Sequence, residues 1–308
     1  MDQAEQLRNL VKKNNQTGSS RPLARVITVT SGKGGVGKSN TAINLAIQLK
    51  KLGQRVIILD ADFGLANIEI MFGTVPKHNF CDLIYQGKNI TEIITWGPMD
   101  VGFISGGSGI AGLSNLSRDY LIYIIQNLAE LDAIADVIII DTGAGISDAV
   151  LEFLVASGEI LLVTTPEPTS ITDSYSLLKA LSRHPRFEKD ASQIKMVANK
   201  VSGKDEGNVL FHKLNAVVSR YLKLNLDYLG MVPQDPALEK AVMQQKPVSM
   251  VNPGAKSAKA YEEMAAHLMN LEKEDKVKKR GMAAFFSHII TGKKMSENGQ
   301  NAANNQSI

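Results

Sequence analysis

The sequence has few of the residues and runs that mark several protein classes. Its 308 residues include one cysteine, Cys81, so neither a disulfide framework nor a cysteine pair for a metal can form within the chain. No run of about eighteen apolar residues is present, which excludes a membrane-spanning helix. The polar N-terminus also lacks the apolar core of a signal peptide. The single cysteine and the lack of membrane and signal segments favour a location in the reducing cytoplasm.

Net charge is also small, because 34 Lys and Arg residues stand against 31 Asp and Glu residues, which gives +3. A strongly basic balance would suggest a polyanionic ligand, and its absence predicts no specific nucleic-acid partner. The hydrophobic share of 44% and the charged share of 21% are typical of a globular protein. A chain of this length can bury a large core in one domain or in two.

A glycine-rich segment is the most informative feature that is present. Residues 32–39 read Gly-Lys-Gly-Gly-Val-Gly-Lys-Ser and follow the apolar run Val26–Thr30, which is the strand-then-loop order of a phosphate-binding P-loop. In such a loop the backbone N–H groups and the following helix N-terminus bind phosphate oxygens, the lysine adds charge and the serine hydroxyl suits Mg²⁺. We therefore predict an ATP and Mg²⁺ site formed by Gly32, Lys33, Gly34, Gly35, Val36, Gly37, Lys38, Ser39 and Asn40.

The chain divides into three zones. Residues 1–21 are polar and end in a linker-like stretch, residues 22–271 alternate apolar runs with amphipathic stretches, and residues 272–308 begin charged and end rich in Asn, Gln and Ser. Because runs such as 137–140 are apolar on both faces, we predict an α/β fold: a three-layer, doubly wound, mainly parallel sheet with helical extensions at the termini. The predicted strands are Val26–Thr30, Arg55–Asp60, Val101–Ser105, Val137–Asp141, Ile160–Thr164, Lys195–Asn199 and Leu226–Val232.

Acidic residues follow two of these strands, at the sheet edge where parallel sheets bind ligands. Asp60 and Asp62 end one strand, and Asp141 ends another just before Thr-Gly-Ala-Gly. We predict that Asp60 and Asp141 belong to the Mg²⁺ shell, together with Ser39, and that Asp62 orients the attacking water. The alternative for a single such residue is an ordinary helix cap.

A second lysine, Lys33, lies within the loop. Most P-loops bind ATP without it, so it is either a solvated lysine or a group that reaches phosphates in a facing subunit, as arginine fingers do. With Lys38 and Asp62 it completes the predicted catalytic set.

These motifs resemble the MinD/ParA class of ATPases with a deviant Walker A motif, over residues 24–270. The resemblance implies that Lys33 acts across an ATP-sandwiched homodimer, that Asp62 positions water, that Asp141 lies in switch II, and that Asn199 and Pro233 line the adenine site. One departure is Ser39-Asn40, where many relatives have two threonines. The matching segments are 33–39, 60–67, 141–145, 165–173, 199–200 and 232–235.

The N-terminal residues 2–8, Asp-Gln-Ala-Glu-Gln-Leu-Arg, resemble the activator motif of the FlhG (FleN, YlxH) flagellar-number ATPases. That resemblance implies that residues 1–13 bind the GTPase FlhF and stimulate its GTP hydrolysis, with flagellar switch-complex proteins and transcription regulators as further partners. Ala4, Leu7 and Leu10 fall on one helical face, as expected for a short helix that folds on a partner.

The C-terminal stretch 278–294 has an apolar stripe between flanking lysines and an arginine; its stripe residues are Met282, Phe285, Phe286, Ile289 and Ile290. We interpret it as an interfacial helix for an anionic membrane surface; the alternative is a helix packed on its own domain. The combined hypothesis is a switch in which ATP closes a homodimer and two tails engage the membrane. The protein would then be cytoplasmic and reversibly bound to the inner face of the cell membrane.

Several other functions use the same core. A MinD division-site ATPase would lack the N-terminal extension, and a ParA partition ATPase would bind DNA through a salt-sensitive basic patch. An iron–sulfur carrier would need more cysteines than Cys81. A small-molecule synthetase would have no use for the terminal helices, and a nucleotide-gated adaptor would show negligible turnover.

Overall fold

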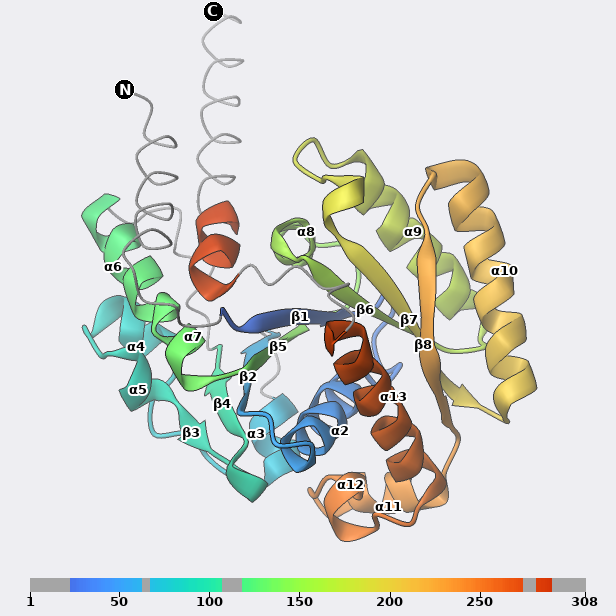
Figure 1. The fold of residues 1–308 in the computed structure, drawn as a ribbon, viewed down its shortest axis with the longest axis horizontal. Coiled ribbons are helices and arrows are strands. Elements are labelled where there is room, and N and C mark those ends of the chain that lie inside the picture. Colours follow the sequence, from blue (N-terminus) through green and yellow to red (C-terminus); the bar gives the residue numbers. More distant parts are fainter. Residues whose placement is uncertain (1–22, 63–66, 107–117, 274–280, 290–308) are drawn as a thin grey trace, which may run out of the picture.

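A single mixed sheet organises the molecule. The computed structural model describes residues 23–62, 67–106, 118–273 and 281–289. Among them eight strands pair in the order β3-β4-β2-β5-β1-β6-β7-β8, parallel throughout except for β3 with β4 (Figure 1). The strands are β1 (Arg25–Thr30), β2 (Val56–Ala61), β3 (Thr95–Trp96), β4 (Gly102–Ser105), β5 (Val137–Thr142), β6 (Glu159–Thr164), β7 (Gln193–Val201) and β8 (Leu226–Pro233).

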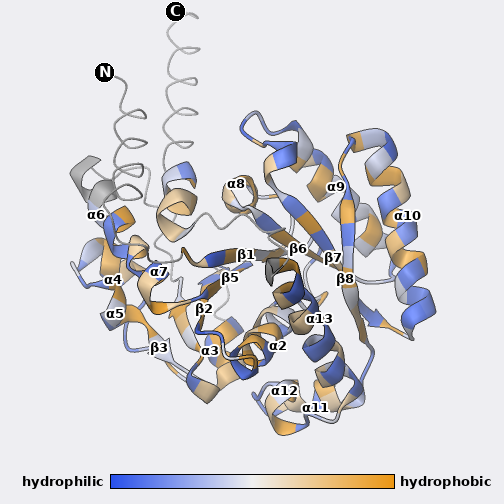
Figure 2. Ribbon diagram, in the orientation of Figure 1, coloured by the Kyte–Doolittle hydropathy of each residue, from blue (hydrophilic) through white to orange (hydrophobic). Residues whose placement is uncertain are grey.

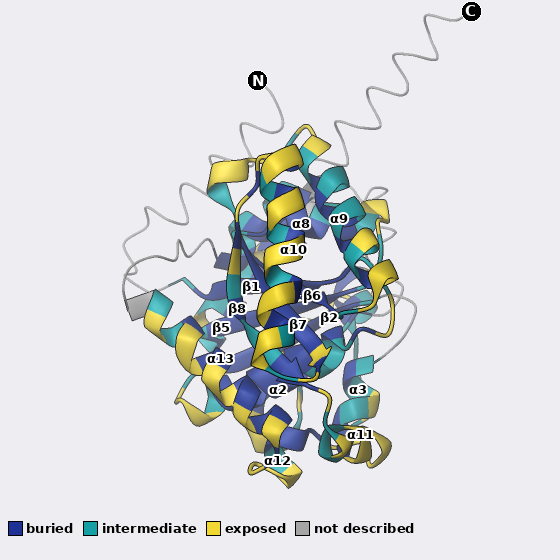
Figure 3. Ribbon diagram, turned by 90° about the vertical axis from the view of Figure 1, so that its right-hand side faces the viewer, coloured by how far each residue is buried: buried dark blue, intermediate teal, exposed yellow. Residues whose placement is uncertain are grey.

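Helices cover both faces of this sheet, which confirms the predicted three-layer fold (Figures 1 and 3). One face packs against α2 (Lys38–Lys51), α3 (Asn67–Phe72), α11 (Pro236–Met243), α12 (Val248–Val251) and α13 (Lys256–Lys273). The other face packs against α4 (Phe80–Tyr85), α5 (Ile90–Ile93), α6 (Arg118–Ala129), α7 (Leu131–Ile134), α8 (Asp148–Ala156), α9 (Pro168–Arg183) and α10 (Lys204–Leu222).

The apolar periodicity explains most of these elements. Strands β1, β2, β5 and β6 are buried along their whole length, as expected for parallel strands covered on both sides. The outer helix α10 is instead amphipathic, with hydrophilic and hydrophobic residues along its length in Figure 2 and a buried face in Figure 3. All seven predicted strands are present within two residues of their predicted bounds. The two-residue edge strand β3 was not predicted, because it is too short to show any period.

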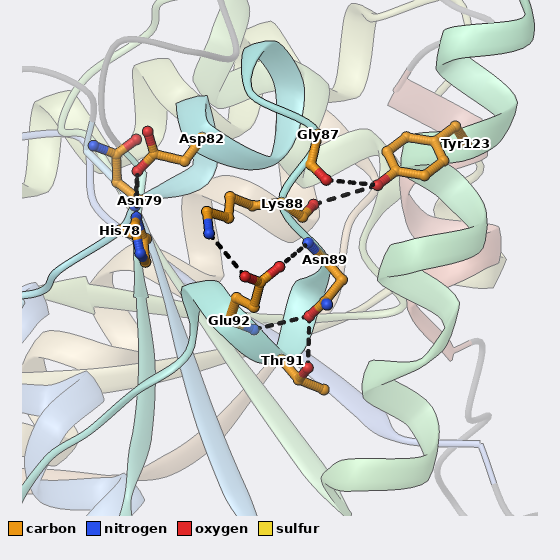
Figure 4. A network of polar contacts seen from close by, with 9 residues as sticks. All are labelled: His78, Asn79, Asp82, Gly87, Lys88, Asn89, Thr91, Glu92 and Tyr123. Atoms are coloured by element: carbon orange, nitrogen blue, oxygen red, sulfur yellow. Dashed lines mark hydrogen bonds and ion pairs between the residues drawn. The ribbon is translucent and has the colours of Figure 1, made fainter.

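Two short helices on the second face are well capped. Asn79 caps α4 and Asn89 caps α5, each through a reciprocal bond with an acidic residue three positions on. Figure 4 shows this network, in which the Tyr123 hydroxyl also donates to the carbonyl oxygens of Gly87 and Lys88. These bonds join α6 to the connection between α4 and α5.

A C-terminal helix, residues 281–289, packs on this second face. The ring of Phe285 is tilted against that of Phe153 at 5.9 Å between centroids, and Phe286 stacks on Phe80, also at 5.9 Å. The four stripe residues that the structure describes, Met282, Phe285, Phe286 and Ile289, are at most 1% exposed and belong to the domain core. The stripe that we expected to face lipid therefore faces the protein in this structure, which is the packed alternative. Ile290 and the flanking cations lie outside the described residues, as do residues 1–13.

None of the described helices is both long enough and apolar enough to cross a lipid bilayer.

Candidate nucleotide site

The P-loop connects β1 to α2 with backbone geometry that requires glycine. Gly35 and Gly37 adopt left-handed conformations with φ of 75° and 96°. A Cβ on Gly32 would lie 2.2 Å from the backbone carbonyl carbon of Asp173, and a Cβ on Gly37 would lie 2.3 Å from the Asn199 amide nitrogen. The loop is therefore fixed by close packing as well as by its turn.

The N-terminus of α2 is arranged to receive an anion. Its cap residue is Gly37, no side chain caps the helix, and its first turn contains no acidic residue, so the first N–H groups are left to a ligand. Lys38 begins the helix and is 8% exposed. Burial lowers the pKa of Lys38, against the opposing charges of Asp141 and Asp62. A phosphate at this position would supply the negative charge that a buried lysine requires.

The three predicted carboxylates converge beside the loop. Asp60 and Asp141 occupy paired register positions on neighbouring strands β2 and β5. Asp60 accepts hydrogen bonds from the backbone N–H groups of Asp62 and Ile68, at 3.1 and 3.3 Å. Burial, followed by the charge of Asp141, raises the pKa of Asp60 to about 7. Asp62 lies against switch II, since its Oδ1 is 3.6 Å from the position of a Cβ on Gly143.

Asp141 is suited to a cation. It is fully buried, and among the described residues neither carboxylate oxygen has a hydrogen-bond partner of normal geometry, with the Ser39 hydroxyl its nearby polar neighbour. Burial raises the pKa of Asp141 to about 6, while the nearby Ser39 hydroxyl and the Lys38 charge act in the opposite direction. No cluster of three acidic, His or Cys ligands occurs in the described part of the chain. Mg²⁺ in P-loop sites uses one or two carboxylates, a hydroxyl and phosphate oxygens, so Ser39, Asp60 and Asp141 fit this ion without such a cluster.

Lys33 is held within its own subunit. Its ammonium group donates to Oε2 of Glu167 at 2.6 Å and to the hydroxyl of Thr169 at 2.8 Å. The hydrogen bond from Lys33 lowers the pKa of Glu167. Glu167 and Thr169 stand at the start of α9, and the lysine side chain remains about one-third exposed. Lys33 therefore lies at the rim of the site in an ion pair that solvent can reach.

Asn199 and Lys200, both in β7, donate hydrogen bonds to the P-loop backbone. The Asn199 amide donates to the Val36 carbonyl at 2.7 Å, and Lys200 Nζ donates to the Gly35 carbonyl at 2.9 Å. Pro233 ends the neighbouring strand β8, where Val201 is its register partner. Asn199 is buried and bonded to the loop itself. The adenine role of Asn199 and Pro233 stays a prediction.

Switch II is held against the end of β1, just before the P-loop. The Gly145 N–H donates to the Ser31 carbonyl at 3.0 Å, and the Thr142 hydroxyl donates to the Val29 carbonyl at 3.0 Å. Residues 142–145 therefore lie beside the segment that leads into the P-loop.

Sequence reasoning missed the residues that position the others, namely Glu167, Thr169 and Lys200. Residues 165–173 and 199–200 had been matched as motifs, but nothing in their spacing indicates which P-loop atoms they contact.

Comparisons with known proteins agree with this geometry. The ParA family model, described as NUBPL iron-transfer P-loop NTPase, matches residues 23–269. The antiactivator FleN of Pseudomonas aeruginosa is 39% identical over 250 residues, covering 81% of this chain and 88% of FleN. The flagellum site-determining protein YlxH of Helicobacter pylori is 31% identical, covering 94% and 98% of the two chains.

Solved structures show the same fold. The septum site-determining protein MinD complexed with Mg-ADP from Pyrococcus horikoshii superimposes with a TM-score of 0.64 at 20% identity, covering 81% of this chain and 98% of that one. The site and the comparisons support the same family assignment. The site has a P-loop with a second lysine and carboxylates at the strand ends, and the relatives match along most of the chain. The chain belongs to the MinD/ParA family of P-loop ATPases, within its FlhG/FleN/YlxH group.

Proposed function

We propose that this protein is an ATP-driven switch that regulates the number and placement of flagella. The names of two relatives, an antiactivator and a flagellum site-determining protein, support the flagellar role. The fold shared with a MinD bound to Mg-ADP, and the fit of Ser39, Asp60 and Asp141 to Mg²⁺, support hydrolysis of Mg-ATP. In this account Lys38 binds the outer phosphates and Asp62 orients the water.

The position of Lys33 is the main observation in support of the proposed ATP-driven switch. Its ion pair with Glu167 is partly exposed, and such pairs contribute only about 0–1 kcal/mol, so the lysine can leave at little cost. A γ-phosphate in a facing subunit would bind it more strongly than one carboxylate does. ATP would thus favour a homodimer in which each Lys33 contacts the nucleotide of its mate.

The dimer tests this proposal directly. We would measure molar mass by light scattering with ATP and with ADP, for the parent chain and for Lys33→Ala. The proposal expects a dimer for the parent with ATP and a monomer in the other cases, and equal dimerisation of the variant contradicts it. Lys189→Ala serves as a matched control, because that lysine follows α9 in the chain and donates instead to the carbonyl of Leu222, the last residue of α10.

Two finer parts of the proposal concern the termini. Residues 1–13 would stimulate the GTPase FlhF, which can be measured by comparing the full chain with one lacking residues 1–20 in a GTP hydrolysis assay. Unchanged stimulation after truncation would exclude that role.

Membrane binding would require helix 281–289 to leave its packed position on the domain. Each buried stripe side chain stabilises the packed form by about 1.5–3 kcal/mol, so release is favourable only where lipid covers the same surface again. Dimerisation would help, because two released helices bind one vesicle together. Flotation with anionic vesicles should therefore depend on ATP, and ATP-independent flotation would contradict this part.

A further inference from the structure

Three segments distant in sequence meet at one half-buried carboxylate, that of Asp132 in α7. The chain entering β1 meets it at Ala24, whose backbone N–H donates to Asp132 Oδ1 at 3.3 Å. The C-terminal helix meets it at Met282, whose N–H donates to the same oxygen at 3.1 Å. In Figure 1 the red helix 281–289 stands next to the start of β1 and to α7.

The junction is tightly packed as well as hydrogen-bonded. Gly281 has a left-handed φ of 68°, and a Cβ there would lie 2.6 Å from Asp132 Oδ2 and 3.0 Å from the side chain of Leu23. Gly281 is therefore required by contact with both neighbours. A shift of the helix start toward these neighbours would have to displace Asp132 or Leu23.

The two N–H groups stabilise the negative charge of the same Asp132 carboxylate. Burial raises the pKa of Asp132, and the N–H groups of Met282 and Ala24 act against this shift by stabilising the charged form. The carboxylate also faces the N-terminal end of the helix, where a negative charge is favourable. Each N–H group also helps to hold the carboxylate in one orientation. When either group leaves, the Asp132 side chain gains rotamer freedom, and the remaining bond alone must offset the entropy of ordering it.

The opposite end of the helix has a separate anchor. Arg186 donates from Nη1 to the His288 carbonyl at 2.8 Å, and its Nη2 contacts Glu152 in α8. This anchor has no contact with Leu23 or Ala24 among the interactions described. It offers a way to loosen the helix without altering the junction.

We propose that Asp132 couples the packing of helix 281–289 against the domain to the ordering of Leu23 and Ala24. The C-terminal helix and the segment that precedes β1 then respond to each other, so that release of one loosens the attachment of the other. This inference deepens the proposed function, because those two ends are the parts proposed to contact membrane and FlhF. Its physical claim rests only on the described contacts.

Hydrogen–deuterium exchange of the full chain tests the coupling without lipid, FlhF or hydrolysis. Gly281→Ala should drive a Cβ into Asp132 and Leu23, and should speed exchange by about tenfold or more in both 281–289 and 23–26, as expected for the loss of bonds to a charged group. Gly53→Ala is the matched control, since Gly53 follows α2 on the other face of the sheet and has a φ of 88° with nothing within 4 Å of its Cβ position, and it should change neither region.

The Arg186→Gln variant is the decisive second experiment, because it loosens the helix from its other end. Faster exchange in 281–289 accompanied by faster exchange in 23–26 supports the coupling. Faster exchange in 281–289 with unchanged protection at 23–26 overturns it, as does a Gly281→Ala variant in which only one region responds. Either failure leaves ATP-dependent dimerisation and flagellar control untouched, so it is distinguishable from failure of the proposed function.

Discussion

Replacing Glu159 with Gln should strongly destabilise the domain. Glu159 accepts two hydrogen bonds from Arg25 and one from Lys195, all at 2.8 Å, at the edge of the sheet opposite the nucleotide site. All three side chains are at most 3% exposed. Removing this shared carboxylate takes a negatively charged partner away from two buried cations, which costs about 3–5 kcal/mol. Arg25 also donates to the Leu268 carbonyl, so α13 should loosen with it.

The assay is urea denaturation of the parent and of Glu159→Gln at pH 7. Glu92→Gln is the control, because glutamine can keep the capping bond to the Asn89 N–H while only the exposed ion pair with Lys88 is lost, which should leave the midpoint nearly unchanged. A loss below about 1 kcal/mol for Glu159→Gln would refute the reasoning, since that is the size expected of a surface pair.

The same group predicts a pH dependence. Burial pushes the pKa of Glu159 upward, but Arg25 and Lys195 outweigh it and hold the pKa below its ordinary value of 4.5. A lowered folded-state pKa means that the stabilisation is complete above 4.5 and is lost as the pH falls through the folded value. The variant should therefore lose less stability than the parent on acidification below pH 4.5.

Three further predictions concern the site and the C-terminal helix. Gly37→Ala should weaken ATP binding by at least about tenfold in calorimetry, because its Cβ meets Asn199 at 2.3 Å, whereas Gly53→Ala, with a similar φ and open space, should not. Asp141→Asn, like chelation of Mg²⁺, should abolish phosphate release while the chain still binds nucleotide; retained turnover would exclude the metal role. Phe285→Ala should lower the free energy of unfolding by about 3–5 kcal/mol, and an unchanged denaturation midpoint would mean that the helix is not packed in the core.

The sequence predicted the parts of the fold that local pattern determines. The P-loop and the strand-end carboxylates Asp60 and Asp141 follow from motifs placed after apolar runs, and parallel pairing then brings them together. The orientation of helix 281–289 could not be predicted this way, because an apolar stripe has the same period whether lipid or protein buries it.

Long-range partners were also beyond sequence reasoning. The contacts of Lys33 with Glu167 and of Asn199 with the P-loop join residues more than 130 positions apart. Spacing along the chain carries no signal for such pairs. The same is true of Asp132, whose two partners come from opposite ends of the described chain.

The most direct test of the central claim, that each subunit lends Lys33 to the nucleotide of its mate, is a mixing experiment. Lys33→Ala and Asp62→Ala should each be inactive alone. In a mixed dimer one site combines an intact Asp62 with a Lys33 from the other subunit, so an equal mixture should recover ATPase activity. The recovered rate should reach at most about a quarter of the parental rate, the value for random pairing, because the loss of one Lys33 weakens the dimer. If the mixture is as inactive as its components, Lys33 does not act across the dimer.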